Sequence, residues 1–520
     1  MTDFLKKIYS IKKTLKLIIN NNFIITDEDR ECRNTIIAIK NNYKLIENDD
    51  ILLVPLMNDN GTMKLITNIA VRFAEENNFC IKYFFVHSLI DIKSSQKSFI
   101  YHLTNILLNW NIASKFKLRY KYDLIKRDII FTNYIKTKKN KEKREINSKE
   151  EVLNFAHNSI AIGDLIYDTY LRFRSKPTVS LNDICLYDIQ EYALDLFSSW
   201  EVLFSSNRIR SLLLPYTSYL HWGIPARLSL KNAVPVFTFG SYFYVLSKLN
   251  SKYPFHSKDY HLYEEIFEKL DRKNERIYKG RQELNIRLKG HIDTGTSYMK
   301  NSAYTKLTEV DFNPVTDKSW AVIFLHCFFD SPHIYGTGLF ADFYDWLEHI
   351  LTKASFNHDT VFYVKPHPNG LPENIEIIEE FKKRFSKFSN VQFISSKISN
   401  LVIAGKKPDA VFTYYGTIAH EFAFLGIPVI TSGDNPHSLF RFVYNPSSIS
   451  ELNTFIENVG NYGLPAGYVQ DDICKFFYMH YLYYSKKYDA SNFIFTKNFL
   501  TGALNLPPEI KFKDLIYESI

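Results

Sequence analysis

The sequence predicts an α/β protein built from two doubly wound parallel sheets. The main observation is a regular alternation of apolar strand-like runs with helical segments beyond residue 320, and a similar unit stands near the N-terminus. Hydrophobic residues make up 46% and charged residues 23% of the 520 residues, which is the ordinary balance of a globular protein. At roughly 100–200 residues per domain, the chain has room for two to four domains.

The clearest strand and helix pattern lies in the second half of the chain. Leu339–Leu351 has apolar residues at helical spacing. Around it, short apolar runs bounded by polar loops read as strands: Trp320–His326, Val361–Val364, Val391–Ile394, Ala410–Thr413 and Val429–Thr431. Strands alternating with helices at this spacing predict a parallel sheet with helices on both faces.

The first half shows a weaker version of the same pattern. Ile51–Leu56 and Tyr83–His87 read as strands on either side of a helix over Met63–Glu76, and strand-like runs return at Ser211–Leu214 and Val234–Phe239. The charged, helical stretch Lys252–Arg287 is expected to close this first domain. We therefore predict a first sheet domain over 1–305, a second over 306–465, and a helical segment over 466–520 that packs back across both.

Composition excludes several other classes. The five cysteines are scattered without a CxxC pair, which argues against a zinc ribbon and against a disulfide framework and suits a reducing cytoplasm. We find neither a secretory leader nor an 18-residue run that could span a membrane, and no motif for a metal or another cofactor. The net charge of +8 suits phosphate-bearing ligands or an anionic membrane face but is too thinly spread to indicate nucleic acid.

Two basic segments leave alternatives open. Phe4–Ile18 has an apolar stripe flanked by lysines, and this amphipathic helix can either dock onto the body of the protein or lie on the inner membrane surface. Lys136–Arg144 reads most simply as a solvated loop. We expect a cytoplasmic protein, with peripheral attachment to the inner membrane as the second reading of the N-terminal helix.

Polar loops follow the predicted strands of the second half. In an open parallel sheet, ligands bind beyond the carboxyl ends of the strands, where the direction of winding reverses. The candidate residues of a donor-binding site all stand in these loops or just beyond them: Asp330, His333, Lys365, His367, Asn369, Tyr415, Gly416, Thr417, Glu421 and Gly433.

The chemistry of these loops points to a phosphate or nucleotide. Gly416 allows the backbone to approach a ligand closely, and Thr417 can cap the helix Ile418–Leu425, whose N-terminus favours a phosphate group. Glu421, one turn inside, could accept hydrogen bonds from ribose hydroxyls. His367, held between two prolines, could contact a phosphate or donate a proton to it. Each feature also has a plain structural reading, as a rigid turn or a capped helix.

Three segments resemble a known family. Val364–Pro368, Asp409–Ala423 and Leu425–Val429 are similar to the C-terminal domain of bacterial capsule and surface-polysaccharide biosynthesis proteins, which are GT-B glycosyltransferases that include the Kdo transferases. The resemblance implies two Rossmann-like domains facing a central cleft, and metal-independent transfer of a sugar from a nucleotide-activated donor to a surface glycan or its lipid-linked precursor. A CMP-linked sugar such as Kdo or sialic acid is favoured, with a UDP-sugar as the second choice.

The resemblance also implies roles for single residues. In this family a His-Pro motif and a Ser-Ser or Ser-Thr pair hold the nucleotide phosphate, and a Glu often binds the ribose. These roles would fall to His367, Thr417 and Glu421. The sequence departs from the pattern at Gly416, which stands where the first Ser is expected and removes one hydroxyl contact. That departure weakens the choice of a CMP-linked donor in particular.

The residue that would activate the acceptor is less clear. A carboxylate or His in the first domain is needed as general base if the mechanism inverts configuration. Candidates are Asp59, His87 and Asp164, of which Asp164 is favoured because Gly163 precedes it and Asp168 follows one helical turn on. Alternatives to a glycosyltransferase are a polyol-phosphate transferase of the teichoic-acid type, a UDP-sugar 2-epimerase, or a non-catalytic component of capsule assembly or export.

Overall fold

The computed structural model describes most of the chain, with gaps. The described residues are 48–56, 60–85, 129–131, 146–238, 246–249, 260–293, 296, 301–305, 312–336, 338–483 and 516–517, with isolated positions between 27 and 46. The expectations for Phe4–Ile18, Lys136–Arg144, Asp59 and His87 lie outside these residues.

The first sheet is a seven-stranded sheet with the order β14-β8-β7-β6-β1-β2-β3. All neighbouring strands pair in parallel except β7 and β8. Strand β1 lies between β6 and β2, and its residues are buried along almost its whole length. The strands are β1 (Asp50–Pro55), β2 (Cys80–Phe85), β3 (Ile129–Phe131), β6 (Arg208–Leu214), β7 (Val236–Thr238), β8 (Leu246–Lys248) and β14 (Ile516–Tyr517).

Helices of residues 60–231 pack with this sheet and form its core. Trp200 of α8 is fully buried and meets the ring of Phe84 edge to face, with ring centroids 5.0 Å apart. Gly163 begins α7 because a Cβ there would stand 2.1 Å from the carbonyl oxygen of Val152. The elements are α3 (Asn60–Asn77), α6 (Lys149–Leu153), the hairpin β4 (Ala156–His157) and β5 (Ile160–Ala161), α7 (Gly163–Arg174), α8 (Ile184–Ser206) and α9 (Tyr219–Lys231).

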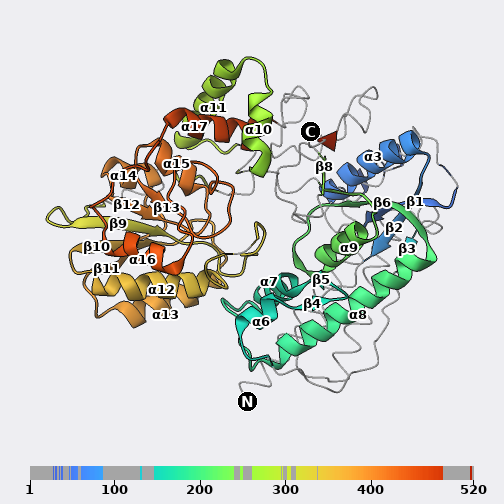
Figure 1. Cartoon of the computed structure of the whole chain (residues 1–520), viewed down its shortest axis with the longest axis horizontal. Coiled ribbons are helices and arrows are strands. Elements are labelled where there is room, and N and C mark those ends of the chain that lie inside the picture. The colour runs from blue at the N-terminus through green and yellow to red at the C-terminus, as the bar shows by residue number, and fades with distance from the viewer. Residues whose placement is uncertain are drawn as a thin grey trace.

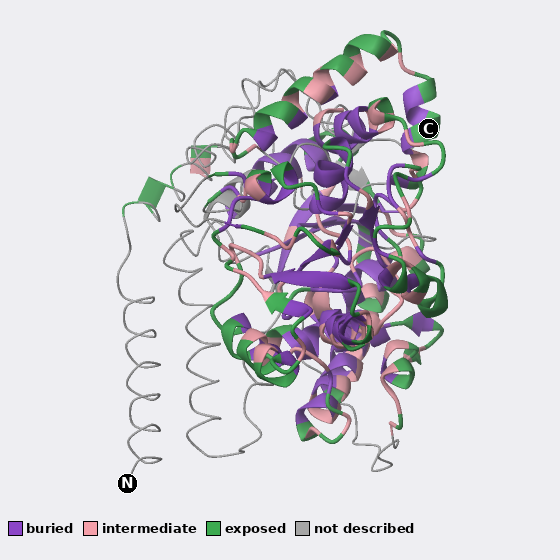
Figure 2. Cartoon of the chain, turned by 90° about the vertical axis from the view of Figure 1, so that its left-hand side faces the viewer, coloured by how far each residue is buried: buried purple, intermediate pink, exposed green. Residues whose placement is uncertain are grey.

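The second sheet has five parallel strands in the order β11-β10-β9-β12-β13. One face packs against α12, α13 and α16, and the other packs against α14 and α15. Figure 1 shows this lobe beside the lobe of the first sheet, and Figure 2 shows how much of both sheets is buried. The elements are β9 (Ser319–Phe324), α12 (Phe343–Phe356), β10 (Thr360–Lys365), α13 (Asn374–Phe385), β11 (Val391–Phe393), α14 (Asn400–Gly405), β12 (Ala410–Phe412), α15 (Ile418–Phe424), β13 (Val429–Ile430) and α16 (Ile449–Glu457).

The predicted fold class is therefore confirmed: the protein is α/β, with two Rossmann-like parallel sheets. In the second sheet the winding reverses at β9, because the chain moves outward through β10 and β11 and then returns to place β12 on the other side of β9. Accordingly, α12 and α15, which follow β9 and β12, cover opposite faces. This is the switch point at which open α/β sheets bind ligands.

The middle helices pack differently from the expectation. α10 (Tyr263–Glu268) and α11 (Lys273–Leu288) share a core with the second sheet and with α17 (Gln470–Phe477), instead of closing the first domain (Figure 1). Gly280 makes the close approach of α11 to α17 possible, because a Cβ there would stand 2.1 Å from the carbonyl oxygen of Cys474. Further on, β14 joins the first sheet beside β8, so the segment after α17 contacts both sheets. The exact domain boundaries stay a prediction.

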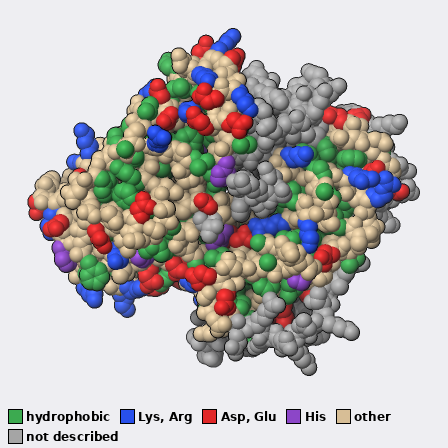
Figure 3. All heavy atoms as spheres, in the orientation of Figure 1, with side chains coloured by type: hydrophobic (Ala, Val, Ile, Leu, Met, Phe, Trp, Pro, Cys, Tyr) green, Lys and Arg blue, Asp and Glu red, His purple; other side chains and the backbone are tan. Residues whose placement is uncertain are grey.

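The two lobes are joined by polar contacts. Asp342 caps α12 through the backbone N–H of Asp345, and its other carboxylate oxygen accepts hydrogen bonds from Tyr167 at 2.5 Å and Thr178 at 2.6 Å. Lys149 donates to both oxygens of Asp345 at 2.7 Å. Figure 3 shows charged and histidine side chains gathered where the lobes meet. Among the described helices, none is long and apolar enough to cross a bilayer.

Candidate functional site

The switch point of the second sheet holds a histidine that the sequence interpretation treated only as the end of a strand. His326 follows β9, and its Nε2 lies 3.2 Å from the hydroxyl oxygen of Thr413 and accepts the backbone N–H of Tyr415 at 3.4 Å. Burial, with a smaller contribution from nearby His367, lowers the pKa of His326 to about 3. The imidazole is therefore neutral. The sequence signal that could have identified His326 is its position as the polar residue at the end of an apolar strand.

Strand β10 brings a lysine and a second histidine to the same edge of the sheet. His367 is partly exposed, and its Nδ1 accepts the backbone N–H of Asn369 at 3.1 Å, which leaves Nε2 as the protonated nitrogen of the neutral ring. Burial and the charge of Lys365 lower the pKa of His367 to about 4. At neutral pH, His367 can donate a hydrogen bond from Nε2 but is not an imidazolium acid.

Lys365 is a buried cation without a carboxylate partner among the described residues. Its side chain is 1% exposed; the ammonium donates to the carbonyl oxygen of Ser396 at 3.3 Å and stands 5.7 Å from the centre of the Phe324 ring. Burial lowers its pKa to about 8, so it remains mostly protonated at neutral pH. An uncompensated positive charge that acts on a neutral histidine favours an anion at this edge.

Gly416 and Thr417 lie in the loop after β12, as predicted. Gly416 does allow a close approach to its backbone, but Thr417 does not cap the helix that follows. A Cβ at Gly416 would stand 2.9 Å from the hydroxyl oxygen of Thr413 and 3.4 Å from Cε1 of His326, so the Thr413 hydroxyl, with the His326 ring beside it, fills the space that a side chain at 416 would need. Thr417 precedes α15, yet its side chain makes no capping hydrogen bond, because its backbone is already helical at φ −58° and ψ −24°. The expected threonine cap is therefore wrong.

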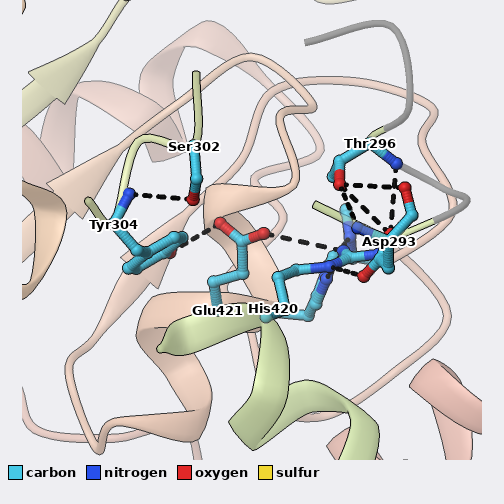
Figure 4. A network of polar contacts seen from close by, with 8 residues as sticks. Asp293, Thr296, Ser302, Tyr304, His420 and Glu421 are labelled. Carbon is cyan, nitrogen blue, oxygen red and sulfur yellow. Dashed lines mark hydrogen bonds and ion pairs between the residues drawn. The ribbon is translucent and has the colours of Figure 1, made fainter. Parts of the chain in front are cut away.

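Glu421 lies inside a buried polar network (Figure 4). Its side chain is 3% exposed; one carboxylate oxygen accepts the Tyr304 hydroxyl at 2.6 Å, and the other lies 3.6 Å from Nη1 of Arg287. Burial outweighs these partners and raises the pKa of Glu421. Arg287 is held in turn by two contacts to Asp293, at 2.6 and 2.9 Å. The carboxylate is thus engaged by protein groups and does not face the edge of the sheet as expected.

Two of the other predicted donor residues have structural partners. The side chain of Asn369 pairs with the backbone of Asn301, donating at 3.1 Å and accepting at 3.4 Å. Gly433, at φ +82°, lets the loop after β13 approach the backbone of Gly338, because a Cβ there would stand 2.5 Å from that Cα. Both residues fix the loops around the site rather than present a free group.

The loops after β9 and β12 are tied to each other. The Tyr415 hydroxyl donates to the carbonyl oxygen of Ser331 at 3.1 Å. Asp330, next to it, is exposed and accepts the backbone N–H of Ser331 at 3.0 Å. His333 is buried, and its Nδ1 lies 2.6 Å from Oδ1 of Asp168 in the other lobe. The structure therefore brings His326, His367, Lys365, Tyr415 and Gly416 together at the switch point, with His333 on the adjoining loop.

Asp164, the favoured general base, is engaged in an ion pair. Arg227 donates to both carboxylate oxygens, at 2.6 and 2.5 Å. Burial acts to raise the pKa of Asp164, but the charge and hydrogen bonds of Arg227 outweigh it and hold the pKa below its ordinary value. A carboxylate with a lowered pKa and a bidentate partner is a poor proton acceptor, so we no longer propose Asp164 as the base.

In the part of the chain that the structure describes, no group of three or more His, Cys, Asp or Glu side chains lies close enough to hold a metal ion. The charge of Lys365 does contribute to the lowered pKa of His367.

Comparisons with known proteins give distant similarities only. No protein-family model and no curated protein matches the chain. Among solved structures, the chain is similar to a β-Kdo 2,4-transferase, KpsC of Thermosulfurimonas dismutans, with 14% identity over 53% of this chain and 81% of that one and a TM-score of 0.32. It is also similar to HepE of Anabaena in complex with UDP-glucose, with 12% identity, coverage of 89% and 92%, and a TM-score of 0.27.

A third similarity is to the UDP-GlcNAc 2-epimerase of Neisseria meningitidis bound to UDP-GlcNAc, with 12% identity over 82% of this chain and 97% of that one, at a TM-score of 0.22. None of these values supports an inference about activity. The fold assignment therefore rests on the strand order of the two sheets.

Proposed function

We propose that the protein is a glycosyltransferase that takes a sugar from a nucleotide-activated donor and that the donor phosphate binds at the switch point of the second sheet. The observation that carries the proposal is Lys365, a buried ammonium with no carboxylate partner among the described residues, beside the Nε2–H of His367 at the carboxyl end of β10. A phosphate here would supply the missing negative charge and accept the histidine hydrogen bond.

The surroundings favour a nucleotide sugar over free phosphate. Lys365 ends β10, His367 follows it and His326 follows β9, while Gly416 in the loop after β12 lets the Thr413 hydroxyl and the His326 ring pack closely against the backbone. The site adjoins the contact between the two lobes, so a donor held by the second lobe would present its sugar towards the first. We further propose a surface glycan or its lipid-linked precursor as the acceptor, on the resemblance of the loop motifs to capsule-synthesis enzymes.

Binding of nucleotides tests this proposal without knowledge of the acceptor. CMP, CDP, UDP and GDP would each be added to the whole protein in a thermal-denaturation assay, followed by calorimetry of any that stabilise it. A nucleotide present at a hundred times its Kd should add about 2.7 kcal/mol to the free energy of unfolding. The matched variants are Lys365→Met, which should weaken the effect, and Lys383→Met on the exposed side of α13, which should not. Absence of stabilisation by all four nucleotides would contradict the proposal.

Attachment to the inner membrane surface is proposed on the lysine-flanked stripe of Phe4–Ile18 alone. Each lysine near an anionic leaflet contributes on the order of 1 kcal/mol, so binding should be reversed by salt. Flotation with anionic liposomes, with and without residues 1–20, measures it. Undiminished binding after the deletion would contradict this role.

A further inference from the structure

The Asp168–His333 pair joins the two lobes beside the proposed phosphate site. Asp168 lies on α7 of the first lobe, and His333 lies on the loop after β9 of the second. Oδ1 of Asp168 stands 2.6 Å from Nδ1 of His333, and both side chains are buried. A histidine whose Nδ1–H is held by a carboxylate has its Nε2 set up as a proton acceptor.

His333 of this pair lies on a loop that is tied to the proposed phosphate site. Ser331, two residues before His333, accepts the hydrogen bond of Tyr415, and Gly416 of the phosphate site is the next residue. Nε2 of His333 makes no hydrogen bond to the residues that the structure describes, whereas Nδ1 does. Nε2 is thus the ring nitrogen that would be left to meet a substrate.

Other charged groups act on His333 from both lobes. Asp164, Tyr167 and Asp168 face it from α7, and Asp342 faces it from the start of α12. Burial acts to lower the pKa of His333, but Asp168, Asp164 and Asp342 outweigh it and raise the pKa above its ordinary value. Burial also raises the pKa of Asp168 to about 6, with His333 opposing the rise. The imidazolium of His333 therefore loses its proton, and the ring becomes able to accept one, only at a pH above the ordinary pKa of histidine.

We propose that His333 is the general base of the transfer reaction and that Asp168 positions it, an inference that rests on the proposed function. As the acceptor oxygen bonds to the anomeric carbon, its proton passes to Nε2 of His333. The bond from that carbon to the phosphate oxygen breaks, and its electron pair leaves with the nucleotide. Asp168 keeps the Nδ1–H in place and stabilises the imidazolium that results.

Donor hydrolysis provides the test, because water then serves as the acceptor. CMP- and UDP-linked sugars would be incubated with the whole protein, and nucleotide release and nucleotide Kd would both be measured. His333→Asn keeps a donor towards Asp168 but lacks a base, so hydrolysis should fall about 100-fold with Kd unchanged. His349→Asn is the matched control and should leave the rate unchanged, since His349 lies on α12 and pairs at 2.7 Å with Asn453 of α16.

The pH profile separates a base and its positioning residue from structural roles. The unsubstituted protein should lose activity as pH falls through the raised pKa of His333, and Asp168→Asn should move that limb to lower pH together with a lower kcat. The proposal about His333 would be overturned if His333→Asn hydrolysed the donor within threefold of the parent rate. It would also be overturned if the acidic fall of the pH–rate profile stayed at the same pH in Asp168→Asn. In both cases, nucleotide binding would leave the proposed function standing. If no nucleotide or nucleotide sugar bound, or no nucleotide sugar were hydrolysed, the proposed function itself would be contradicted, and with it the proposal about His333.

Discussion

Replacing Lys365 by methionine is expected to stabilise the protein while weakening nucleotide binding. The pKa of Lys365 falls from the ordinary 10.5 to about 8 because the ammonium is buried. At about 1.4 kcal/mol per pKa unit, keeping it charged in the native state costs about 3 kcal/mol at neutral pH. Methionine removes this cost, but the variant also loses the hydrogen bond to Ser396, which destabilises it by about 1 kcal/mol. The expected net gain is about 2 kcal/mol.

The pH dependence gives the sign of the effect independently. Between pH 8 and 10.5, the unfolded chain keeps the proton of Lys365 while the native protein has lost it, so the stability of the parent rises with pH across this window. The advantage of the methionine variant should therefore be constant below pH 8 and disappear towards pH 10. Urea denaturation of both proteins at pH 7 and pH 10 measures it.

Nucleotide affinity should move in the opposite direction. Loss of one charge-assisted contact is worth about 1.5–3 kcal/mol, so Kd should rise roughly ten- to a hundredfold in Lys365→Met. Lys383→Met should alter neither stability nor Kd. A methionine variant that is less stable than the parent at pH 7, or that binds nucleotide with the parent's affinity, would refute the view of Lys365 as an uncompensated cation of a phosphate site.

Three further substitutions test the neighbouring groups. His367→Ala should lower turnover about 100-fold without unfolding because it removes the Nε2–H that would stabilise the leaving phosphate, and NMR titration of the parent should find His367 neutral down to about pH 4; a midpoint near 6.5 would contradict its burial. Glu421→Gln should cost no more than about 1 kcal/mol of stability, because burial makes the charge of Glu421 unfavourable and Arg287 keeps its two contacts to Asp293, and a loss above about 3 kcal/mol in denaturation would show that Arg287 depends on Glu421 in the network of Figure 4. Asp164→Asn should cost about 3 kcal/mol by breaking the pair with Arg227, which denaturation measures, and a loss below 1 kcal/mol would speak against that pair.

Much of the second sheet could be predicted because its strands are short apolar runs separated by helices of regular spacing. The predicted Val361–Val364 and Ala410–Thr413 match β10 (Thr360–Lys365) and β12 (Ala410–Phe412) within a few residues. The packing of Lys252–Arg287 could not be predicted in the same way, since an amphipathic helix shows which face is buried but not which sheet buries it. Sequence proximity favoured the first domain, and contact with α17, nearly 200 residues away, decided otherwise.

The candidate site was predictable in position but not in its partners. The loop position of His367 and Gly416 followed from the strand pattern, whereas the engagement of Asp164 by Arg227 joins residues 63 positions apart. The pair of Asp168 and His333 spans 165 positions and two lobes. Such long-range side-chain contacts leave no periodicity in the sequence. The sequence analysis therefore named Asp164, Asp168 and His333 without their partners and did not single out Arg227.

The most direct test of the phosphate site is a structure of the whole protein with a bound nucleotide. Our account predicts that the phosphate lies beyond the carboxyl ends of β9, β10 and β12, within hydrogen-bonding distance of Nε2 of His367 and next to Gly416. A nucleotide bound at the first sheet, or at the second sheet away from His367, would contradict it.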